Sequence, residues 1–198
     1  YETPFGVPPF DLIKSEHYMP AFIEGMAQQM VEIDEIVNNE KKATFKNTVR
    51  ALDNSGKILD KVSNAFFGLS GANTNDELQA IQREVTPLLT EHSNNINFNE
   101  KLFARVKELF DNKDKIKLTD EEAFILENMY KGFVRSGIML EADAQDKMKA
   151  LNQRESGLVV QFNQNELAEK MNELIKAHRG EMVMGKDQLA EREGNEKK

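Results

Sequence analysis

The sequence contains no cysteine and no tryptophan, and only five of its 198 residues are proline. Without cysteine, disulfide frameworks, thiolate zinc sites, iron–sulfur ligation and cysteine nucleophiles are all excluded. No apolar run approaches the roughly 20 residues that a membrane-spanning helix requires. No convincing strand-like alternation of apolar and polar residues occurs either. Any chemistry must therefore come from carboxylate, imidazole, hydroxyl and amide groups on a helical framework.

Positive charge is also in short supply. The chain has 26 Lys and Arg against 34 Asp and Glu, which gives a net charge of −8. Such a chain repels a phosphate backbone on average, and no Lys/Arg cluster is large enough to reverse that locally. The sequence therefore predicts no nucleic-acid partner and no membrane partner. Its length is typical of one compact unit, or of one unit with an appendage.

The prolines are concentrated at the start, where Pro4, Pro8, Pro9 and Pro20 fall within the first twenty residues. This predicts an extended arm over residues 1–17. Residues 18–179 are predicted to form an all-α, multi-helix bundle, and residues 180–198 a polar tail. Apolar residues recur at helical spacing in seven stretches. These stretches run over residues 18–37, 45–52, 58–69, 78–92, 102–110, 125–133 and 141–178.

Several helix boundaries carry capping signals. Thr44 and Asn99 are predicted to cap the helices that follow them. Thr74 with Glu77, and Thr119 with Glu122, have the spacing of a capping box. Residues 70–73 are predicted to form a turn before Thr74. Pro87 lies inside an apolar stripe and is expected to kink or break that helix.

The last helical stretch is unusually long. From Glu141 to His178, one predicted apolar face would extend about 57 Å at 1.5 Å per residue. A compact domain of this length has a diameter of roughly 40 Å, so a straight helix would reach beyond its own bundle. Either the helix bends, for which Gly157 offers a position, or its apolar face is covered by protein outside this chain.

Signatures of catalysis are lacking. The three histidines are His17, His92 and His178, and none has a second histidine or a glutamate at the spacing of H-E-x-x-H or E-x-x-H metal sites. Gly68 and Gly71 belong neither to a phosphate-binding loop nor to a nucleophile elbow. We therefore predict no catalytic residue, no metal ligand and no cofactor within this chain.

One stretch is unusual enough to suggest binding. Between Phe66 and Asp76, small and amide residues follow two aromatic residues, which allows close approach of another backbone. The candidate binding residues, in a loop that would contact a peptide or another domain, are Ser70, Gly71, Asn73 and Thr74. The alternative is a tight connection between two helices with no binding role.

The order of several segments resembles a known family. The segments are Pro8-Pro9-Phe10-Asp11, Glu16 to Phe22, Thr44 to Thr48, Leu69 to Asp76, Lys101 to Val106, Tyr130 to Gly137 and Phe162 to Asn165. Together they resemble the amino-terminal part of the thimet-oligopeptidase family of zinc metallopeptidases, in its bacterial peptidyl-dipeptidase and oligopeptidase A branch. The likeness runs from about Phe5 to Leu167.

The resemblance implies an all-helical, non-catalytic region that forms part of the wall of a substrate channel. The zinc site of the family, with its H-E-x-x-H motif, has no counterpart in this chain and is expected in a separate catalytic half. The implied partners are that catalytic half and short unfolded peptides. The alternative is a stand-alone helical module that binds peptides or proteins without cutting them, and a purely structural role is a third reading. The compartment stays open, with a slight lean towards the bacterial periplasm because cysteine is absent and the chain does not begin with Met.

Overall fold

The computed structural model describes the backbone of residues 3–195 and the side chains of residues 3–178. It confirms the all-α prediction, since the described residues form helices and no strand. The chain divides into one unit over Tyr1–Gly157 and a second over Leu158–Lys198, each of which is described by itself. The main helices are α1 (Tyr18–Val37), α2 (Arg50–Asp53), α3 (Lys57–Ala72), α4 (Asp76–Asn97), α5 (Glu100–Asp111), α6 (Asp120–Ser136) and α7 (Ala142–Asn195). Short turns of helix are η1 (Pro4–Gly6), η2 (Ser15–His17), η3 (Phe45–Val49) and η4 (Lys113–Lys115).

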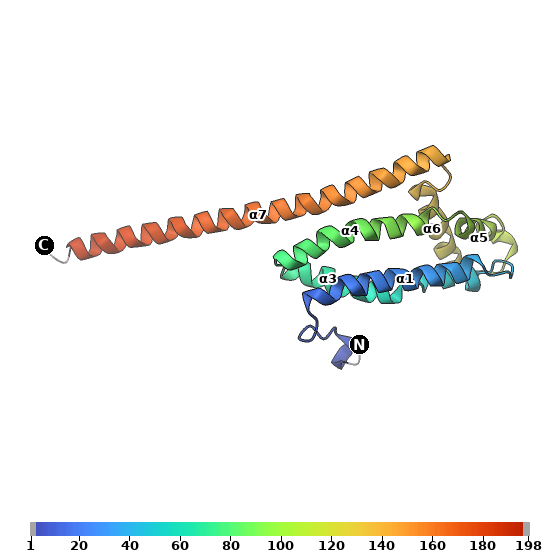
Figure 1. Cartoon of the computed structure of the whole chain (residues 1–198), viewed down its shortest axis with the longest axis horizontal. Helices are drawn as coiled ribbons and strands as arrows, with labels where there is room; N and C mark the ends of the chain where they lie inside the picture. The colour runs from blue at the N-terminus through green and yellow to red at the C-terminus, as the bar shows by residue number, and fades with distance from the viewer. Residues whose placement is uncertain (1–2, 196–198) are drawn as a thin grey trace. The chain divides into compact units, whose positions relative to one another are not determined.

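In the first unit, α1 runs beside α3 and α4 (Figure 1). Phe22 on α1 and Phe66 on α3 are fully buried, and their rings meet edge to face with centroids 5.4 Å apart. The helices come this close because Gly25 faces α3, where a Cβ atom at Gly25 would lie 3.0 Å from the Leu59 Cα atom. Burial of these aromatic and aliphatic side chains supplies the main stabilisation of this end.

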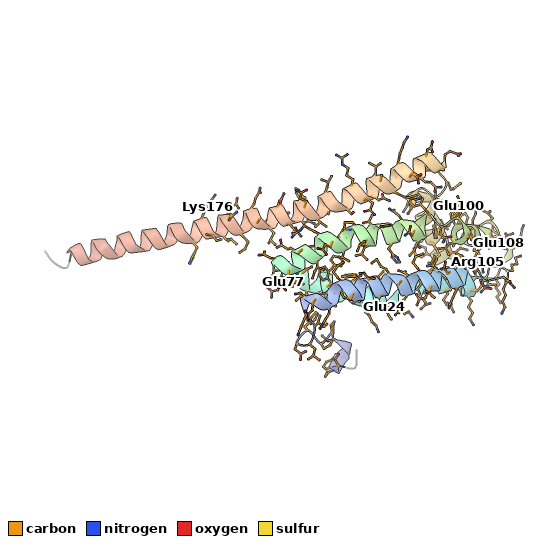
Figure 2. All side chains as sticks on the ribbon, viewed as in Figure 1. Glu24, Glu77, Glu100, Arg105, Glu108 and Lys176 are labelled. Carbon is orange, nitrogen blue, oxygen red and sulfur yellow. The ribbon has the colours of Figure 1, made fainter. Side chains whose placement is uncertain are left out.

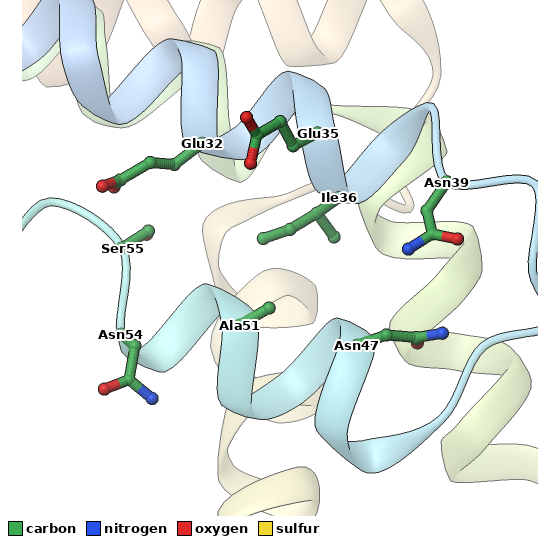
Figure 3. A pocket seen from close by; sticks show the side chains of 8 residues that line it. All are labelled: Glu32, Glu35, Ile36, Asn39, Asn47, Ala51, Asn54 and Ser55. Atoms are coloured by element: carbon green, nitrogen blue, oxygen red, sulfur yellow. The ribbon is translucent and has the colours of Figure 1, made fainter.

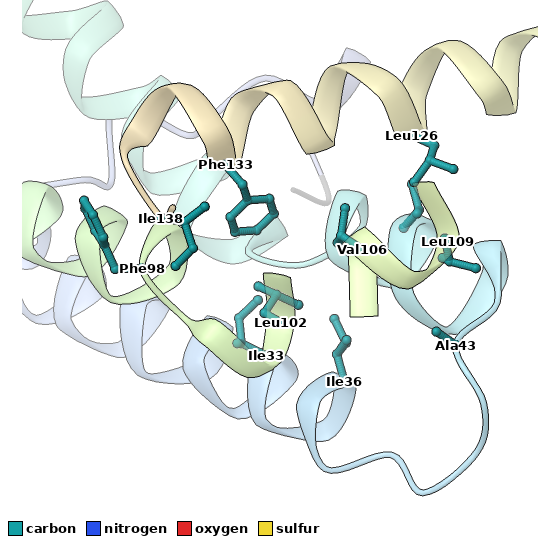
Figure 4. Packing of buried hydrophobic residues seen from close by; sticks show 11 residues of the cluster. Ile33, Ile36, Ala43, Phe98, Leu102, Val106, Leu109, Leu126, Phe133 and Ile138 are labelled. Atoms are coloured by element: carbon teal, nitrogen blue, oxygen red, sulfur yellow. The ribbon is translucent and has the colours of Figure 1, made fainter. Parts of the chain in front are cut away.

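A second cluster of buried side chains joins the far end of α1 to η3, α5 and α6 (Figure 4). Leu102 and Val106 lie one turn apart on α5, which places both in the cluster, and neither is exposed to solvent. Phe103 and Phe110 on α5 stack on Tyr130 of α6 at its edge. The cluster consists of Ile33, Ile36, Ala43, Val49, Phe98, Leu102, Val106, Leu109, Leu126, Phe133 and Ile138.

Three of the four predicted helix caps are confirmed. Thr44, Asn99 and Thr119 each accept a hydrogen bond from a backbone amide in the first turn, as predicted, and Thr119 forms the predicted capping box with Glu122. The predicted cap at Thr74 is wrong. Asn75 caps α4 instead, because its extended backbone directs its side chain to accept from the Leu78 amide at 2.8 Å.

The predicted turn before α4 needs correction, and of the kink or break expected at Pro87 the break does not occur. The turn expected over residues 70–73 begins later, since α3 continues through Ala72 and ends at Asn73, whose amide donates to the Leu69 carbonyl. Helix α4 runs from Asp76 to Asn97 without a break at Pro87. The Pro87 carbonyl accepts a hydrogen bond from the Gln153 side chain at 3.1 Å, so α7 contacts α4 at this position.

The predicted long last helix is confirmed, since α7 begins at Ala142 and its backbone is helical to Asn195. In the first unit, α7 is held to α4 largely by polar contacts. Asn152 donates to Asn94 at 2.8 Å, and the Lys149 ammonium lies 5.0 Å from the centroid of the Phe98 ring.

The predicted arm ends where α1 begins at Tyr18. The boundary predicted after residue 179 falls inside α7, and residues 1–2 and 196–198 lie outside the described residues. No helix in residues 3–178 is long and apolar enough to cross a membrane.

Candidate functional site

The four predicted binding residues lie where α3 gives way to α4. Ser70 and Gly71 occupy the last turn of α3, Asn73 ends that helix, and Thr74 stands in the short connection before Asn75. Ser70 and Thr74 are half-buried, while Gly71 and Asn73 are exposed. The structure thus keeps the four residues together at one end of the helix pair, and their role in binding stays a prediction.

This connection rests on aromatic side chains. Phe66 and Phe67 in α3 have ring centroids 5.1 Å apart, and Tyr18 meets Phe66 at 4.9 Å. Nothing lies within 4 Å of a Cβ atom built at Gly68 or Gly71. The end of α3 therefore combines a rigid aromatic base with an outer surface on which another chain could approach the helix backbone.

Two grooves elsewhere in the first unit are lined by other residues. The first, of about 310 Å³, lies between the last turns of α1 and the η3–α2 segment (Figure 3). Glu32 and Glu35 of α1 stand on one wall and Asn54 on the other. The groove is also lined by Ile36, Asn39, Asn47, Ala51 and Ser55.

Several polar groups of this groove already have partners within the fold. One Glu32 carboxylate oxygen accepts from the Gly56 amide at 2.7 Å, and Asn54 donates to the Arg50 carbonyl at 2.7 Å. Asn47 accepts from the Thr44 amide and donates to the Lys42 carbonyl. The groove is therefore largely a product of how the η3–α2 segment is fastened to α1, with acceptor oxygens at its rim.

The second groove, of about 390 Å³, lies between η3–α2 and the start of α6. Arg50 spans it, with its guanidinium 3.2 Å from the Glu122 carboxylate and 5.7 Å from the centroid of the Phe45 ring. Asp53 and Glu121 add two further carboxylates to the lining. The Arg50 guanidinium joins Phe45 of η3 to Glu122, the capping-box partner of Thr119 in α6. These contacts hold the two elements together.

A buried polar network crosses the first unit at His92. The His92 Nε2 atom lies 2.7 Å from the Gln29 Oε1 atom, and the Gln29 amide nitrogen donates to the Ser55 hydroxyl at 3.2 Å. Because that amide nitrogen faces Ser55, the Gln29 oxygen must accept from His92, which fixes the proton of the neutral imidazole on Nε2. Burial lowers the pKa of His92. His92 is thus a neutral structural donor under ordinary conditions.

A zinc site does not fit the described residues. Within residues 3–178, no group of three or more His, Asp or Glu side chains is placed to hold a metal ion. The three histidines are dispersed, since His17 ends η2, His92 pairs with Gln29 and His178 lies on α7. His17 already accepts a hydrogen bond from the Lys14 amide through Nδ1. No catalytic step can be assigned to these side chains.

Several peptidases have sequences similar to that of this chain. No protein-family model matches the chain. The chain is 39% identical over 165 residues to the dipeptidyl carboxypeptidase of Salmonella typhimurium, and 26% identical over 165 residues to oligopeptidase A of the same organism. Each match covers 83% of this chain and 24% of the relative. A thimet-like oligopeptidase of Dictyostelium discoideum is 22% identical over 155 residues.

Over 83% of its length the chain is similar to peptidases of the thimet-oligopeptidase family. The resemblance drawn from the sequence is thereby confirmed. The chain spans about a quarter of the length of the family members that it matches. The activity of any longer protein is therefore a proposal.

Sequence reasoning missed the first groove and the His92 network. Asn54, Ser55 and Gly56 signalled a break between helices, which is correct, since Gly56 has a left-handed backbone with φ of 73°. The same break brings Ser55 to Gln29 and the Gly56 amide to Glu32. These pairings join residues more than twenty positions apart, and no local spacing signals them.

Proposed function

We propose that this chain is a non-catalytic helical part of a peptidase, and that it shapes the channel through which short peptides reach a separate catalytic part. The observation that carries the proposal is the 39% identity, over 165 residues, with a protein named dipeptidyl carboxypeptidase. The lack of a metal-binding group within residues 3–178 is consistent with it. The fold supplies rigid paired helices, which suit a wall better than a reactive centre.

The proposal assigns zinc and the hydrolytic step to polypeptide outside this chain. About three quarters of the length of the matched relatives lies beyond the region that this chain covers. The partner of the chain is therefore that catalytic part, and short unfolded peptides are the molecules admitted. The surface at Ser70, Gly71, Asn73 and Thr74 is the candidate for contact with a peptide or with the partner.

A chimera tests this function directly. The chain would replace the matched region of the Salmonella dipeptidyl carboxypeptidase, and cleavage of short peptides would be followed by mass spectrometry. We expect the chimera to cleave an unfolded peptide and to spare the same segment held inside a folded protein. The control is the relative with its matched region deleted. If that control cleaves both substrates as the chimera does, the proposed role in shaping the channel is wrong.

The first groove supports a second function, that of a stand-alone helical module. Its free rim is rich in acceptors, including the Glu35 carboxylate, and it would suit a cationic side chain of a bound peptide. The two functions predict different sizes of the native product. An antibody raised against this chain should detect a band several-fold heavier than 22.6 kDa if the peptidase proposal holds, and a band at 22.6 kDa if the chain acts alone.

A further inference from the structure

The second unit exposes an unusual amount of apolar surface on a single helix. Leu158 is 54% exposed, and Phe162 and Leu174 are each 66% exposed. Isolated exposed apolar residues are normal on a protein surface, whereas a dense group marks a surface that another protein covers. The exposed large apolar residues of this segment are Leu158, Val159, Phe162, Leu167, Met171, Leu174 and Ile175.

These side chains occupy two sides of the helix. Leu158 and Phe162 are one turn apart and share one side. Nine residues separate Leu158 from Leu167, which is about two and a half turns, so Leu167 lies on the opposite side. Met171 and Leu174 continue the side of Leu167. Side chains project from both sides of this stretch, in which Lys176 is labelled (Figure 2).

Charge is distributed as expected for a covered helix. Residues 156–165 contain no charged side chain, although 30% of the whole sequence is charged. A helix that stays in water normally carries charged residues over most of its surface. From Glu166 onward charges return, and Glu169 and Lys176 lie on the side opposite Leu167 and Leu174. Lys170 lies beside these two leucines, where its ammonium pairs with Glu166 at 2.6 Å. The uncharged stretch and the exposed apolar residues therefore form one surface, of the kind that another protein covers.

Resting on the proposed function, we infer that residues 158–175 of α7 are a docking surface for the polypeptide that, in the relatives, lies outside the matched region. A second copy of this chain explains the surface less well. A symmetric pair buries the same side of each helix and would leave the other apolar side in water. The matched relatives contain about three times more polypeptide outside the matched region than within it, which is enough to pack on both sides.

Binding in trans tests the inference. The chain and the unmatched part of the Salmonella dipeptidyl carboxypeptidase would be produced separately, and their dissociation constant measured. Replacing Leu174 with Lys, alone and together with Leu167→Lys, should weaken binding by more than about tenfold, because each places a charge in the apolar contact. The matched control is Asn172→Lys, which adds the same side chain one turn from both Glu169 and Lys176, on the charged side of this part of the helix, and should bind like the unchanged chain. Circular dichroism would verify that each variant keeps its helix content.

A second measurement covers the case in which the separated part of the relative does not fold. In the chimera described above, Leu174→Lys should lower the melting temperature, while in the isolated chain, where Leu174 is exposed, it should change that temperature little. The inference is overturned if the chain neither binds in trans nor shows this difference in the chimera. It is also overturned if the isolated chain is a dimer that Leu174→Lys dissociates and the relative's part does not bind.

The two proposals fail separately. A complex that forms and depends on Leu174 but admits folded and unfolded substrates alike would keep the docking surface and remove the channel role. A chimera that selects unfolded peptides and is insensitive to Leu174→Lys would keep the channel role and remove the docking surface.

Discussion

Arg105 shows how one side chain fixes a loop that carries almost no apolar residues. It projects from α5 close to Glu108 (Figure 2) and reaches the segment that links α1 to η3. Its guanidinium donates to the Asn39 carbonyl at 2.9 Å and to the Lys41 carbonyl at 3.3 Å, and its Nε atom donates to the Thr48 hydroxyl at 3.3 Å. The Thr48 hydroxyl is fully buried, whereas Asn39 is half-buried and Lys41 is exposed. Arg105 therefore satisfies one buried polar group and also ties the loop backbone to α5.

Replacing Arg105 with Ala should therefore lower the free energy of unfolding by about 1–3 kcal/mol, because the loop carbonyls and the buried Thr48 hydroxyl lose a charged hydrogen-bond donor. Urea unfolding followed by circular dichroism would measure the change. Arg154→Ala is the control, since Arg154 is exposed on α7 and should contribute little. An equal effect of the two substitutions would show that Arg105 does not hold the loop in this way.

His92 gives the chain a dependence of stability on pH. Burial lowers the pKa of His92 in the folded state, whereas the unfolded chain titrates at about 6.5. The unfolded state thus binds the proton more readily, so stability is full above about pH 6.5 and falls as the pH drops towards the folded pKa. Each unit by which the pKa is lowered corresponds to about 1.4 kcal/mol.

The difference in unfolding free energy between about pH 7.5 and about pH 5.5 should be larger for the unchanged chain than for His92→Gln, which removes this titration. His178→Gln serves as the control, because it makes the same replacement at an exposed histidine. Identical pH slopes for the unchanged chain and His92→Gln would contradict the assignment of the effect to His92.

At the scale of the helix, sequence reasoning succeeded where the signal is local. The spacing of apolar residues placed α1 at Tyr18–Val37, and the caps at Thr44, Asn99 and Thr119 follow from the residue that opens each helix. It failed at Thr74, where the neighbouring Asn75 competes for the same role and holds it. It also failed in assigning one apolar face to the last helix, since Leu158 and Leu167 lie on opposite sides of α7.

Alanine substitutions at one glycine of α1 and one glycine of α3 should change the free energy of unfolding in opposite directions. Gly68 lies inside α3 with nothing within 4 Å of an added Cβ atom, so Gly68→Ala should raise the free energy of unfolding by about 0.5–1 kcal/mol through better helix propensity. Gly25→Ala should lower it, because the added atom would lie 3.0 Å from the Leu59 backbone. Thermal unfolding of both variants would measure the two signs. A stabilised Gly25→Ala variant would mean that α1 and α3 are not packed this closely.

For the whole molecule, several ordered segments of the sequence showed a resemblance to a peptidase family, and the sequence predicted an all-α chain. It could not reveal which surfaces come together, because the first groove, the His92 network and the Arg105 contacts each join residues distant in the sequence. The candidate binding residues at the end of α3 were placed near one another by their position in the chain alone. Their surroundings come from the packing of α3 on α1, which depends on the aromatic residues beneath them.

The isolated chain is expected neither to hydrolyse peptides nor to bind zinc in a one-to-one ratio. A protein zinc site needs three or four ligands, and the described residues bring no three His, Asp or Glu side chains together for a metal. Elemental analysis after dialysis against zinc, combined with mass spectrometry of incubated peptides, would measure both properties, with the Salmonella dipeptidyl carboxypeptidase as the positive control for peptide cleavage. Zinc bound one-to-one, together with activity that a chelator abolishes, would contradict the prediction.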